Sequence, residues 1–459
     1  MVMGELPERV DLAVVGGGVG GYVAAIRAAQ LGMNVAIVEK EKMGGHCLNY
    51  ACIPSKTLIK IADMFYEIQH SEKFGIHVDS ATINPQEMYD WRIAASKKLE
   101  TGVEFLCKQY GIEIIKDTGT FVSSNSLQMT NGTSLEFKHA IIATGSEPVE
   151  LKGFEFGGNV IDYKKALLLQ TIPKSMAIIG AGYVAVEVGT LYAKLGSKVH
   201  IIARSDVLSH FDRDAVEIVK KRMQELGIIL HLGANPISHD SSSLTLSNGE
   251  KIECEIIVAA VGLAPYTKNL GLENTKVQLD EKGFIKVDKS LKTADASMLA
   301  IGDVANEPML AHKAMRQAVV AAEVASGMNS VYDSVVPSVI FSDPEIAVAG
   351  KLDEEGTEVT KFPFSALGRS IALDKTKGFV KIAYDTDNVV KGVEIVGEDA
   401  STMIAEAVLA IEMGAVLEDI AESIHPHPTY SEALQEAAEA ALGRPVHFFY
   451  GNKKQKGQT

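Results

Sequence analysis

The sequence predicts an α/β protein in which one unit of strand, glycine turn, helix and strand occurs twice and is followed by an α+β domain. Glycine-rich turns at residues 16–21 and 180–185 each follow an apolar, β-branched run and open a stretch of helical periodicity. From about residue 337, alternating strands precede two helical stretches, without a glycine turn of this kind. The chain of 459 residues is too long for a single core, because domains usually hold ~100–200 residues.

The first unit runs from the apolar strand at residues 10–15 to an acidic residue at the end of the next strand. In such a turn Gly16 permits the tight bend, Gly18 lets the backbone approach a pyrophosphate, and Gly21 lets helix and strand pack closely. The helix N-terminus offers unpaired N–H groups to the anion, and Glu39 can accept hydrogen bonds from a ribose. A purely structural turn does not account for the strands, the helix and the acid together. We therefore predict a Rossmann-like dinucleotide-binding domain.

The same pattern returns at Gly180, Gly182 and Ala185, after the strand in "SMAIIG". Two dinucleotide folds in one chain suggest two dinucleotides, and a sensible pairing is FAD kept in place with NAD or NADP that exchanges. The acid of the first unit is replaced by Ala203, and Arg204 follows. An acid would pair with the 2′-hydroxyl of NAD, whereas an arginine can neutralise a 2′-phosphate. The alternatives are therefore NADP bound by Arg204, or NAD bound through the loop beside a solvated arginine.

Three further strands end in turns that can contact a cofactor. The strand in "HAIIATGSEP" opens at Thr144 and Gly145, and the strand in "IIVAAVGLAP" opens at Gly262. The strand in "ASMLAIGDVA" ends at Gly302 and Asp303. The carboxylate of Asp303 could bind a ribityl or ribose hydroxyl, and its alternative role is a helix cap. We predict that these five residues bind the cofactors.

Composition and charge exclude several classes of partner. A net charge of -15 and a pI near 5.3 disfavour nucleic acid, whose phosphates would repel the chain. The start has no basic n-region, and no apolar run approaches the ~18 residues of a membrane span. We therefore expect a cytoplasmic protein with no membrane partner. Four cysteines are too few for a secreted disulfide scaffold.

Two of the cysteines, Cys47 and Cys52, lie five residues apart in "GGHCLNYACIPSK". Zinc would require C-x2-C spacing and a second pair, and His46 adds only one more ligand, so no metal site is expected. Incidental burial of two small thiols does not explain the neighbouring glycines, Pro54 and Lys56. A bridge across this spacing needs an irregular first helical turn, and a strained disulfide is easily reduced. We predict a redox-active pair.

Seven stretches together resemble the flavoprotein disulfide reductase family (class I pyridine nucleotide-disulfide oxidoreductases), and within it the dihydrolipoamide dehydrogenases. In chain order they are "VVGGGVGGYVAAIRAAQLG", "GGHCLNYACIPSK", "IIATGSEP", "IIGAGYVAVEVG", "AIGDVANEPMLAHKA", "PSVIFSDPEIAVAG" and "IHPHPTYSEA". The resemblance spans nearly the whole chain. It implies an FAD-binding domain (1–147), an NAD(P)-binding domain (148–268), a central segment that completes the FAD-binding region (269–336) and a dimerisation domain (337–459).

The resemblance assigns roles to the cysteines and to a base. Cys47 resembles the interchange thiol that reacts with substrate, and Cys52 the charge-transfer thiol that lies against the flavin. In "HPHPTYSE", His427 resembles the family's base and Glu432 the acid that orients it. His425 lacks the Pro-Thr-x-Ser-Glu register and is set aside. In this family the base reaches the disulfide of the opposite subunit, so a homodimer is implied.

Lys56 and Glu187 resemble an ion pair beside the flavin, near the point where hydride crosses to the nicotinamide. The implied reaction is oxidation of protein-bound dihydrolipoamide to lipoamide through a Cys47–Cys52 disulfide, with electrons passed through FAD to NAD(P)⁺. The lipoyl group would come from a separate protein of a 2-oxoacid dehydrogenase complex or a glycine cleavage system.

Departures from the family pattern keep two other functions open. Ala51 replaces the usual glycine before the second cysteine, and Ala203 with Arg204 looks more like glutathione reductase. An NADPH-dependent reductase of glutathione or another small disulfide, running in the opposite direction, is therefore an alternative. A second is a non-catalytic structural subunit of a 2-oxoacid dehydrogenase complex, although the complete set of cysteines, histidine and glutamate argues against a silent site.

Overall fold

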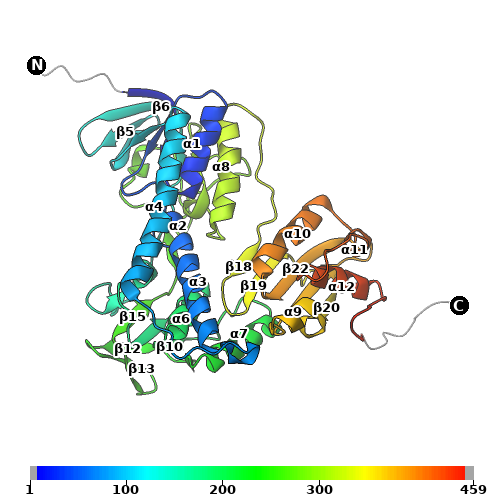
Figure 1. Cartoon of the computed structure of the whole chain (residues 1–459). Coiled ribbons are helices and arrows are strands. Elements are labelled where there is room, and N and C mark those ends of the chain that lie inside the picture. The colour runs from blue at the N-terminus through cyan, green and yellow to red at the C-terminus, as the bar shows by residue number, and fades with distance from the viewer. Residues whose placement is uncertain (1–7, 450–459) are drawn as a thin grey trace, which may run out of the picture. The chain divides into compact units, whose positions relative to one another are not determined.

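The computed structural model of the chain describes residues 8–449 and divides into two compact units (Figure 1). Unit 1 comprises Met1–Arg204 with Ala234–Asp333, and unit 2 comprises Ser205–Gly233 with Ser334–Thr459. The predicted fold class is confirmed, because unit 1 contains two strand, glycine turn, helix and strand units and unit 2 contains an α+β domain. The boundaries of the four predicted domains stay a prediction.

The first sheet of unit 1 has the order β3-β2-β1-β6-β5-β4, and β17 also pairs with β6. Its strands are β1 (Glu8–Val15), β2 (Val35–Val38), β3 (Glu113–Ile115), β4 (Gly119–Ser123), β5 (Ser126–Met129), β6 (Ser134–Ile142) and β17 (Met298–Ala300). Strand β1 is parallel to β2 and β6, and β17 is parallel to β6. Strands β4, β5 and β6 pair antiparallel. The parallel strands form the dinucleotide-binding type of core that the first glycine turn predicts.

Strand β1 is buried on both faces, as expected for a central parallel strand. Leu12 and Val14 pack against helices α1 (Val19–Gln30) and α8 (Ala311–Ala325). Ala13 and Val15 face a second core that includes Phe121 of β4. Small residues on α1 and α8 allow the two helices to pack closely together. This packing holds the N-terminus of α1 at the carboxyl end of β1, where the first glycine turn lies.

The second glycine unit forms a parallel sheet in the order β10-β9-β15-β8. Its elements are β8 (Val160–Ile161), β9 (Ser175–Ile179), α6 (Tyr183–Lys194), β10 (Lys198–Ala203) and β15 (Ile256–Ala259). The two units repeat one hydrogen bond, since Gly16 N–H donates to Val38 O at 2.8 Å and Gly180 N–H to Ile202 O at 2.9 Å. The sequence repeat is therefore also a structural repeat.

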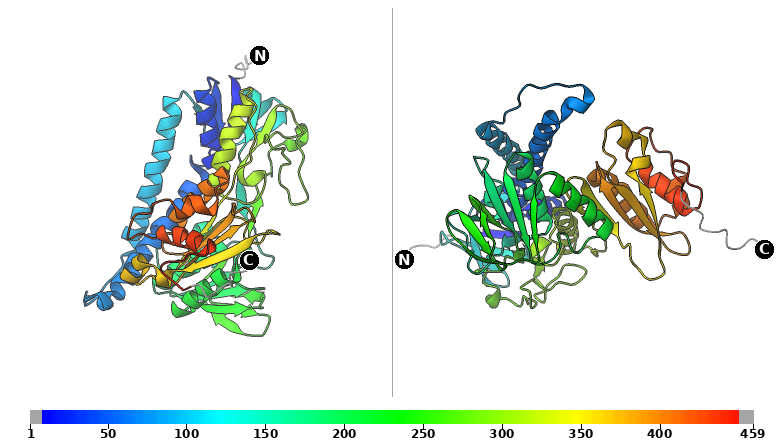
Figure 2. Two further views of the ribbon diagram at one scale, coloured as in Figure 1. Left: turned by 90° about the vertical axis from the view of Figure 1, so that its right-hand side faces the viewer. Right: turned by 90° about the horizontal axis from the view of Figure 1, so that it is seen from below.

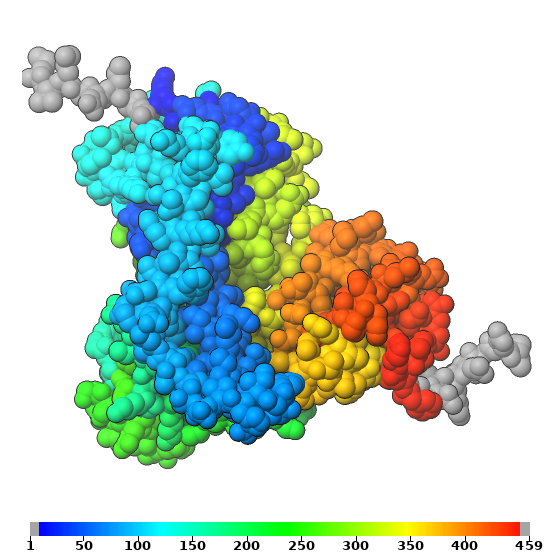
Figure 3. Space-filling model, in the orientation of Figure 1, coloured from blue at the N-terminus to red at the C-terminus, as the bar shows by residue number. Residues whose placement is uncertain are grey.

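Further elements of unit 1 connect these sheets. Helices α3 (Cys52–Gln69) and α4 (Pro85–Gln109) run side by side, and α3 also packs against α6 (Figures 1 and 2). Residues of α3 and α4 make up much of the blue surface in the space-filling view (Figure 3). The remaining elements are α2 (Gly45–Asn49), η1 (Ser71–Phe74), β7 (Ser146–Pro148), α5 (Tyr163–Ala166), β12 (Pro236–His239), β13 (Ser243–Leu246), β14 (Lys251–Glu253), β16 (Leu263–Pro265), η2 (Leu272–Asn274) and η3 (Gly302–Val304).

Unit 2 is built around an antiparallel sheet in the order β18-β19-β22-β21-β20. These strands are β18 (Ser338–Ile340), β19 (Glu345–Gly350), β20 (Glu358–Pro363), β21 (Phe379–Tyr384) and β22 (Val390–Gly397). Helices α10 (Ala400–Met413) and α12 (Glu432–Ala441) cover one face and share its apolar core. The other elements are α7 (Arg213–Glu225), β11 (Ile229–Leu232), η4 (Phe364–Ala366), α9 (Gly368–Ala372) and α11 (Leu417–Ala421).

The opposite face of this sheet carries charges. Lys381 of β21 forms ion pairs with Asp212 at 2.7 Å and Asp214 at 3.1 Å, and Lys361 of β20 pairs with Asp214 at 2.9 Å. These contacts attach the N-terminal end of α7 to the sheet. Among the residues that the structure describes, no helix combines the length and apolar character that a bilayer crossing requires.

The bend at Gly16 leads to a prediction about stability. Gly16 has φ +105°, and a Cβ there would lie 2.4 Å from Ala143 O, whereas at Gly32, with φ +85°, a Cβ would meet nothing within 4 Å. Both Gly→Ala changes therefore strain the backbone, but only Gly16→Ala adds a clash with a strand end. We expect Gly16→Ala to cost at least about 2 kcal/mol more unfolding free energy than Gly32→Ala in denaturant titrations. Equal losses would contradict this account of the turn.

Candidate functional site

The two cysteines lie on either side of a break between two helices. Cys47 is in the five-residue helix α2, and Cys52 is the first residue of α3. Ala51 between them is not helical, with φ -131° and ψ -91°. The Asn49 amide holds the preceding turn by donating to Met43 O and Gly45 O, both at 3.0 Å. The helix break thus supplies the irregular turn that the spacing requires.

Both residues are free thiols in this structure, and each is partly buried. A hydrogen bond between the two thiols raises the pKa of Cys47, and burial raises it further. The same bond lowers the pKa of Cys52, and the charge of Lys56 lowers it too. These opposite shifts favour the form of the reduced pair in which a protonated Cys47 donates to a Cys52 thiolate. A thiolate is the nucleophilic and electron-donating form of cysteine.

Lys56 lies one helical turn after Cys52 on α3 and forms an ion pair with Glu187 of α6. The Lys56 Nζ to Glu187 Oε2 distance is 2.9 Å, and the Glu187 side chain is only 9% exposed. The packing of α3 against α6 brings together two charges that are 131 residues apart in sequence. A carboxylate buried to this degree requires a cation, and Lys56 provides one beside the thiolate.

Two tyrosines near the thiolate were missed by the sequence analysis. Tyr163 begins α5 and is 8% exposed, and burial together with nearby negative groups, Cys52 among them, raises its pKa. Tyr183 begins α6 directly after Gly182. Partial desolvation and the charges of Asp303 and Glu187 raise the pKa of Tyr183 to about 12. Both phenols thus stay protonated at neutral pH, and the place of Tyr183 after the second glycine turn is the signal that could have identified it.

His46, considered above only as a metal ligand, instead faces a lysine. Its Nε2 lies 3.0 Å from Nζ of Lys164. Burial, followed by the charge of Lys164, lowers the pKa of His46 to about 4. The imidazole is therefore neutral near pH 7 and accepts a hydrogen bond from the lysine. The sequence gives no sign of this pair, because its members come from α2 and α5.

The first glycine turn fits a dinucleotide. Gly18 is the N-cap of helix α1 and, having no side chain, leaves the helix N-terminus uncapped, and the first turn holds no acid, so its N–H groups can receive a phosphate. The two carboxylate oxygens of Glu39 accept from the N–H groups of Gly17 at 2.6 Å and Glu41 at 2.7 Å. These bonds hold Glu39 at the edge of the turn, where a ribose would lie.

Two other predicted cofactor segments lie in the same unit. Asp303, in η3 after Gly302, accepts a hydrogen bond from Ser146 Oγ at 2.7 Å, and burial raises its pKa. The hydroxyl of Thr144 donates to Tyr266 O at 2.7 Å, and Gly145 O accepts from Tyr266 N–H at 2.9 Å. These bonds stabilise the turn that follows β6.

The second turn also fits a dinucleotide. Gly182 is the N-cap of helix α6, again with neither a capping side chain nor a first-turn acid. Ala185 is buried, and Gly262 has φ +133°. Pairing of Ile179 with Ile202 repeats that of Val15 with Val38, so the register sets Ala203 at the position of Glu39. The next residue, Arg204, is exposed.

His427 and Glu432 lie in unit 2, at the N-terminal end of α12. His427 Nδ1 is 2.7 Å from Glu432 Oε1, and the histidine side chain is 77% exposed. The other oxygen of Glu432 accepts from Thr429 N–H at 2.7 Å. The carboxylate thus holds the Nδ1–H tautomer and leaves Nε2 as the basic nitrogen.

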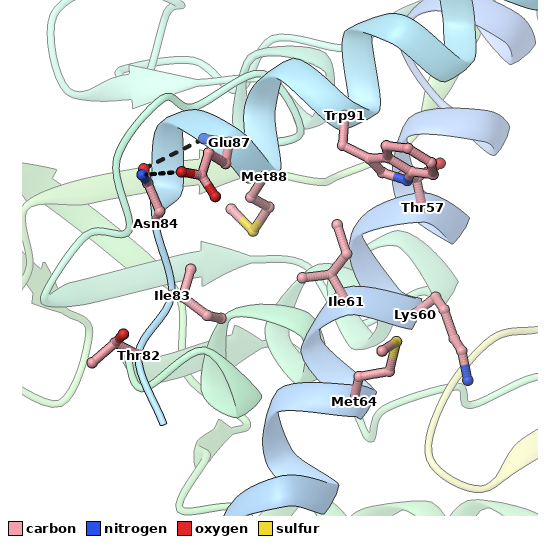
Figure 4. Close-up of a pocket in the computed structure, with 10 residues that line it drawn as sticks. All are labelled: Thr57, Lys60, Ile61, Met64, Thr82, Ile83, Asn84, Glu87, Met88 and Trp91. Atoms are coloured by element: carbon pink, nitrogen blue, oxygen red, sulfur yellow. Dashed lines mark hydrogen bonds between the residues drawn. The ribbon is translucent and has the colours of Figure 1, made fainter. Parts of the chain in front are cut away.

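A separate cavity of about 620 Å³ lies between α3 and α4 (Figure 4). It is lined by Thr57, Lys60, Ile61, Met64, Thr82, Ile83, Asn84, Glu87, Met88 and Trp91. Asn84 caps α4 there and also donates to Glu87 at 2.9 Å. These lining residues include none of the predicted site residues.

The hydrogen-bonded cysteine pair can exchange an electron pair with a substrate disulfide or dithiol. The same unit contains two turns suited to dinucleotides, which can carry the electron pair further. The fold and this site define a dinucleotide-dependent thiol–disulfide oxidoreductase. The sequence-family model described as pyridine nucleotide-disulphide oxidoreductase matches residues 10–318. The family model of the dimerisation domain of these enzymes matches residues 336–438. The chain belongs to the pyridine nucleotide-disulphide oxidoreductase family.

Curated relatives support the same assignment. A dihydrolipoyl dehydrogenase of Geobacillus stearothermophilus is 43% identical over 466 residues, which cover 97% of this chain and 99% of the relative. Dihydrolipoyl dehydrogenase 2 of Haloarcula marismortui is 41% identical over 471 residues, which cover 97% of this chain and 100% of the relative. The predicted family is confirmed, as is the prediction of an oxidoreductase that uses FAD and a nicotinamide dinucleotide.

Solved structures share the fold. LpdA from Mycobacterium tuberculosis superposes with a TM-score of 0.88 at 24% identity, covering 95% of this chain and 99% of that chain. The flavoprotein disulfide reductase RclA from Escherichia coli has a TM-score of 0.85 at 22% identity, and the match covers 94% of this chain and 99% of that chain. At these identities the likeness concerns the fold alone.

Proposed function

We propose that this chain is a dihydrolipoamide dehydrogenase, which oxidises protein-bound dihydrolipoamide to lipoamide through a Cys47–Cys52 disulfide and reduces NAD(P)⁺ by way of FAD. The observation that carries this proposal is the cysteine pair itself, with the pKa of Cys47 raised and that of Cys52 lowered. The relatives named as dihydrolipoyl dehydrogenases over the full chain support the substrate class.

The first half-reaction is thiol–disulfide exchange. A substrate thiolate attacks Sγ of Cys47, the Cys47–Cys52 bond breaks, and Cys52 leaves as a thiolate. The second substrate thiolate then attacks the substrate sulfur that is bonded to Cys47. This attack closes the lipoamide disulfide and releases Cys47. The dithiol loses two electrons, which remain on the cysteine pair. Of the two protons, one ends on Cys47 and the other on His427.

The residues around Cys52 stabilise this product state. The Cys47 thiol donates to the Cys52 thiolate, and Lys56 adds positive charge beside it. Glu187 fixes the direction of Lys56 through the 2.9 Å ion pair. Bound FAD would supply the conversion between thiol exchange and hydride transfer to the nicotinamide. The residues that would hold it are Gly16, Gly18, Gly21, Glu39, Lys56, Thr144, Gly145, Gly302 and Asp303.

His427 acts as the base, through Nε2, on the cysteine pair of a second copy of the chain. Glu432 supports this role, because its hydrogen bond to Nδ1 fixes the tautomer and stabilises the imidazolium that forms. The dimerisation-domain match at residues 336–438 supports a homodimer. The proposed partner is the lipoyl-bearing protein of a 2-oxoacid dehydrogenase complex or a glycine cleavage system, and a cytoplasmic location remains a prediction.

Crossed steady-state assays test the function. The purified holoprotein is assayed with dihydrolipoamide and NAD⁺ or NADP⁺, and with oxidised glutathione and NADPH. We expect the dihydrolipoamide reactions to exceed the glutathione reaction by at least about 100-fold in kcat/KM. A larger rate with glutathione would establish the alternative function instead. No activity with either substrate would favour a structural subunit.

The choice of nicotinamide depends on Arg204. The nicotinamide would be held by Gly180, Gly182, Ala185, Arg204 and Gly262. If Arg204 binds a 2′-phosphate, Arg204→Ala lowers the NADP/NAD ratio of kcat/KM about 10-fold, because a charge-assisted bond is lost. Lys198→Ala, which removes an exposed cation at the other end of β10, is the control and leaves the ratio unchanged. An unchanged ratio in the Arg204 variant would assign this arginine to the solvated surface.

A further inference from the structure

The histidine that the sequence analysis set aside is held more firmly than the proposed base. The His425 side chain is only 5% exposed, whereas that of His427, two residues later, is 77% exposed. His425 Nδ1 lies 2.9 Å from Ser423 O, and Nε2 lies 2.9 Å from Glu406 Oε1. Both ring nitrogens therefore have a partner within unit 2.

Both partners are acceptors. A backbone carbonyl and an ionised carboxylate offer no hydrogen, and a neutral imidazole carries only one N–H. The two bonds can form together only when both ring nitrogens are protonated. The hydrogen bond to Glu406, which is the largest cause, raises the pKa of His425, and Glu432 of α12 adds a second nearby negative charge. The two contacts with acceptors thus favour the imidazolium form of His425, with acidic groups of α10 and α12 nearby.

The carboxylate partner belongs to a rigid element. Glu406 lies in α10, whose buried residues Met403, Ile404 and Ala407 are part of the apolar core above β19 and β22. His425 lies in the segment 422–431, which joins α11 to α12 and contains no regular helix or strand. The bond to Glu406 therefore ties an irregular segment to a packed helix.

His427 lies between two anchors of this segment. On its N-terminal side is His425, and on its C-terminal side Glu432 binds both the His427 ring and the Thr429 N–H. Thr429 Oγ1 also donates to Pro426 O at 2.7 Å. The first anchor ties this segment to α10, so its loss would leave the backbone before His427 less firmly held and the exposed imidazole less precisely placed.

We propose that His425 is a positioning residue, which as an imidazolium bound to Glu406 and Ser423 O fixes the backbone that carries His427. This inference rests on the proposed function, because it acts through His427 as the base. The His425 clamp, meaning the two hydrogen bonds of its ring, speeds the dithiol half-reaction without contact with substrate.

The clamp gives a defined pH dependence. The pKa of His425 is raised above its usual value of 6.5, so both bonds are complete below the raised pKa and one is lost as the pH rises through it. The rate of the dithiol half-reaction therefore falls on the alkaline side. His425→Gln removes the titrating group, so its rate is lower at neutral pH and this alkaline fall is absent.

Rapid mixing of holoprotein with dihydrolipoamide measures the half-reaction for His425→Gln, Glu406→Gln and the double variant. We expect each single change to slow it about 10-fold at neutral pH, and the double variant to be no slower than the worse single variant. Reduction of the flavin by NADH should remain unchanged. The matched control is His447→Gln, which removes another histidine of unit 2 that is paired with a glutamate, Glu436, at 2.5 Å. The proposal would be overturned if the two single effects multiplied in the double variant, or if His425→Gln kept the alkaline fall in rate of the wild type.

Nuclear magnetic resonance with ¹⁵N-labelled histidine gives a test without activity. The His425 signal, assigned by its loss in His425→Gln, should titrate above 6.5, and Glu406→Gln should lower its midpoint. A midpoint at or below 6.5 would overturn the clamp. If wild-type protein fails to oxidise dihydrolipoamide, the proposed function fails, and the titration still decides whether the His425 clamp exists. Flavin content and circular dichroism establish that each variant is folded.

Discussion

Replacing Cys52 with serine is expected to lower dihydrolipoamide turnover by at least about 10³-fold, because serine can neither form the disulfide nor leave as a thiolate. The same change should remove the long-wavelength thiolate–flavin absorbance from two-electron-reduced holoprotein. Steady-state kinetics and anaerobic reduction followed by absorbance measure the two effects. Apoprotein gives a further readout, since the variant should lose the thiol that alkylates at the lowest pH.

Cys47→Ser is the matched control, because it removes the other sulfur and leaves Cys52 in place. A serine hydroxyl can still donate to the Cys52 thiolate, as the Cys47 thiol does in the structure. The control should therefore keep the absorbance of a thiolate against the flavin and yet fail to turn over. If Cys52→Ser retained the band while Cys47→Ser lost it, the two roles would be reversed.

The pH dependence of this absorbance follows from the direction of the Cys52 shift. Its pKa is lowered, first by the hydrogen bond from Cys47 and then by Lys56. The thiolate therefore persists to lower pH than that of an unperturbed cysteine, and it is lost as the pH falls through the lowered pKa. Lys56→Met removes part of the stabilisation, so the loss of the band should shift to higher pH.

The glycine turns explain why so much of unit 1 could be predicted from sequence. A glycine at position 16 or 180 permits a conformation with φ +105° or +126° in which any side chain would clash with a neighbouring strand end. That requirement is local, so the strand before each turn and the helix after it are readable from a few residues. The match of Ala203 to Glu39 followed from the same repeat, and the strand register agrees with it.

Contacts between distant elements could not be predicted in this way. The neighbours of Cys52 come from α5 and α6, and nothing in the local pattern around Tyr163 indicates that it lies near a thiolate. The pair of His46 and Lys164 has the same origin. The ion pair of Lys56 and Glu187 was expected only because the chain resembles a known family, since either residue alone would be taken for a surface charge.

The two histidines of "HPHPTYSE" illustrate the limit of motif reading. The register of the motif distinguishes His427, which carries the acid Glu432 at the right distance along the chain. It gives no role to His425, whose partner Glu406 lies 19 residues earlier on α10. The sequence contains both residues of that pair, but only the packing of α10 against the sheet brings them together.

Replacing His427 with glutamine should slow the dithiol half-reaction by about 10²–10⁴-fold, because the change removes the group proposed to take the proton from the substrate thiol. Glutamine retains a polar side chain of similar length, so the effect reports the loss of the base. Rapid mixing with dihydrolipoamide measures it, while flavin reduction by NADH should proceed at the wild-type rate because that step involves no substrate thiol.

Glu432→Gln separates orientation from basicity. The amide oxygen can still accept from Nδ1 at the 2.7 Å position of Glu432 Oε1, but it does not stabilise the imidazolium as a carboxylate does. The dithiol half-reaction of Glu432→Gln should therefore be slower than that of the wild type and faster than that of His427→Gln.

An undiminished dithiol rate in His427→Gln would remove this histidine as the base. A slow rate in both half-reactions would indicate damage to cofactor binding instead. Loss confined to the dithiol half is thus the result that assigns the proton to His427.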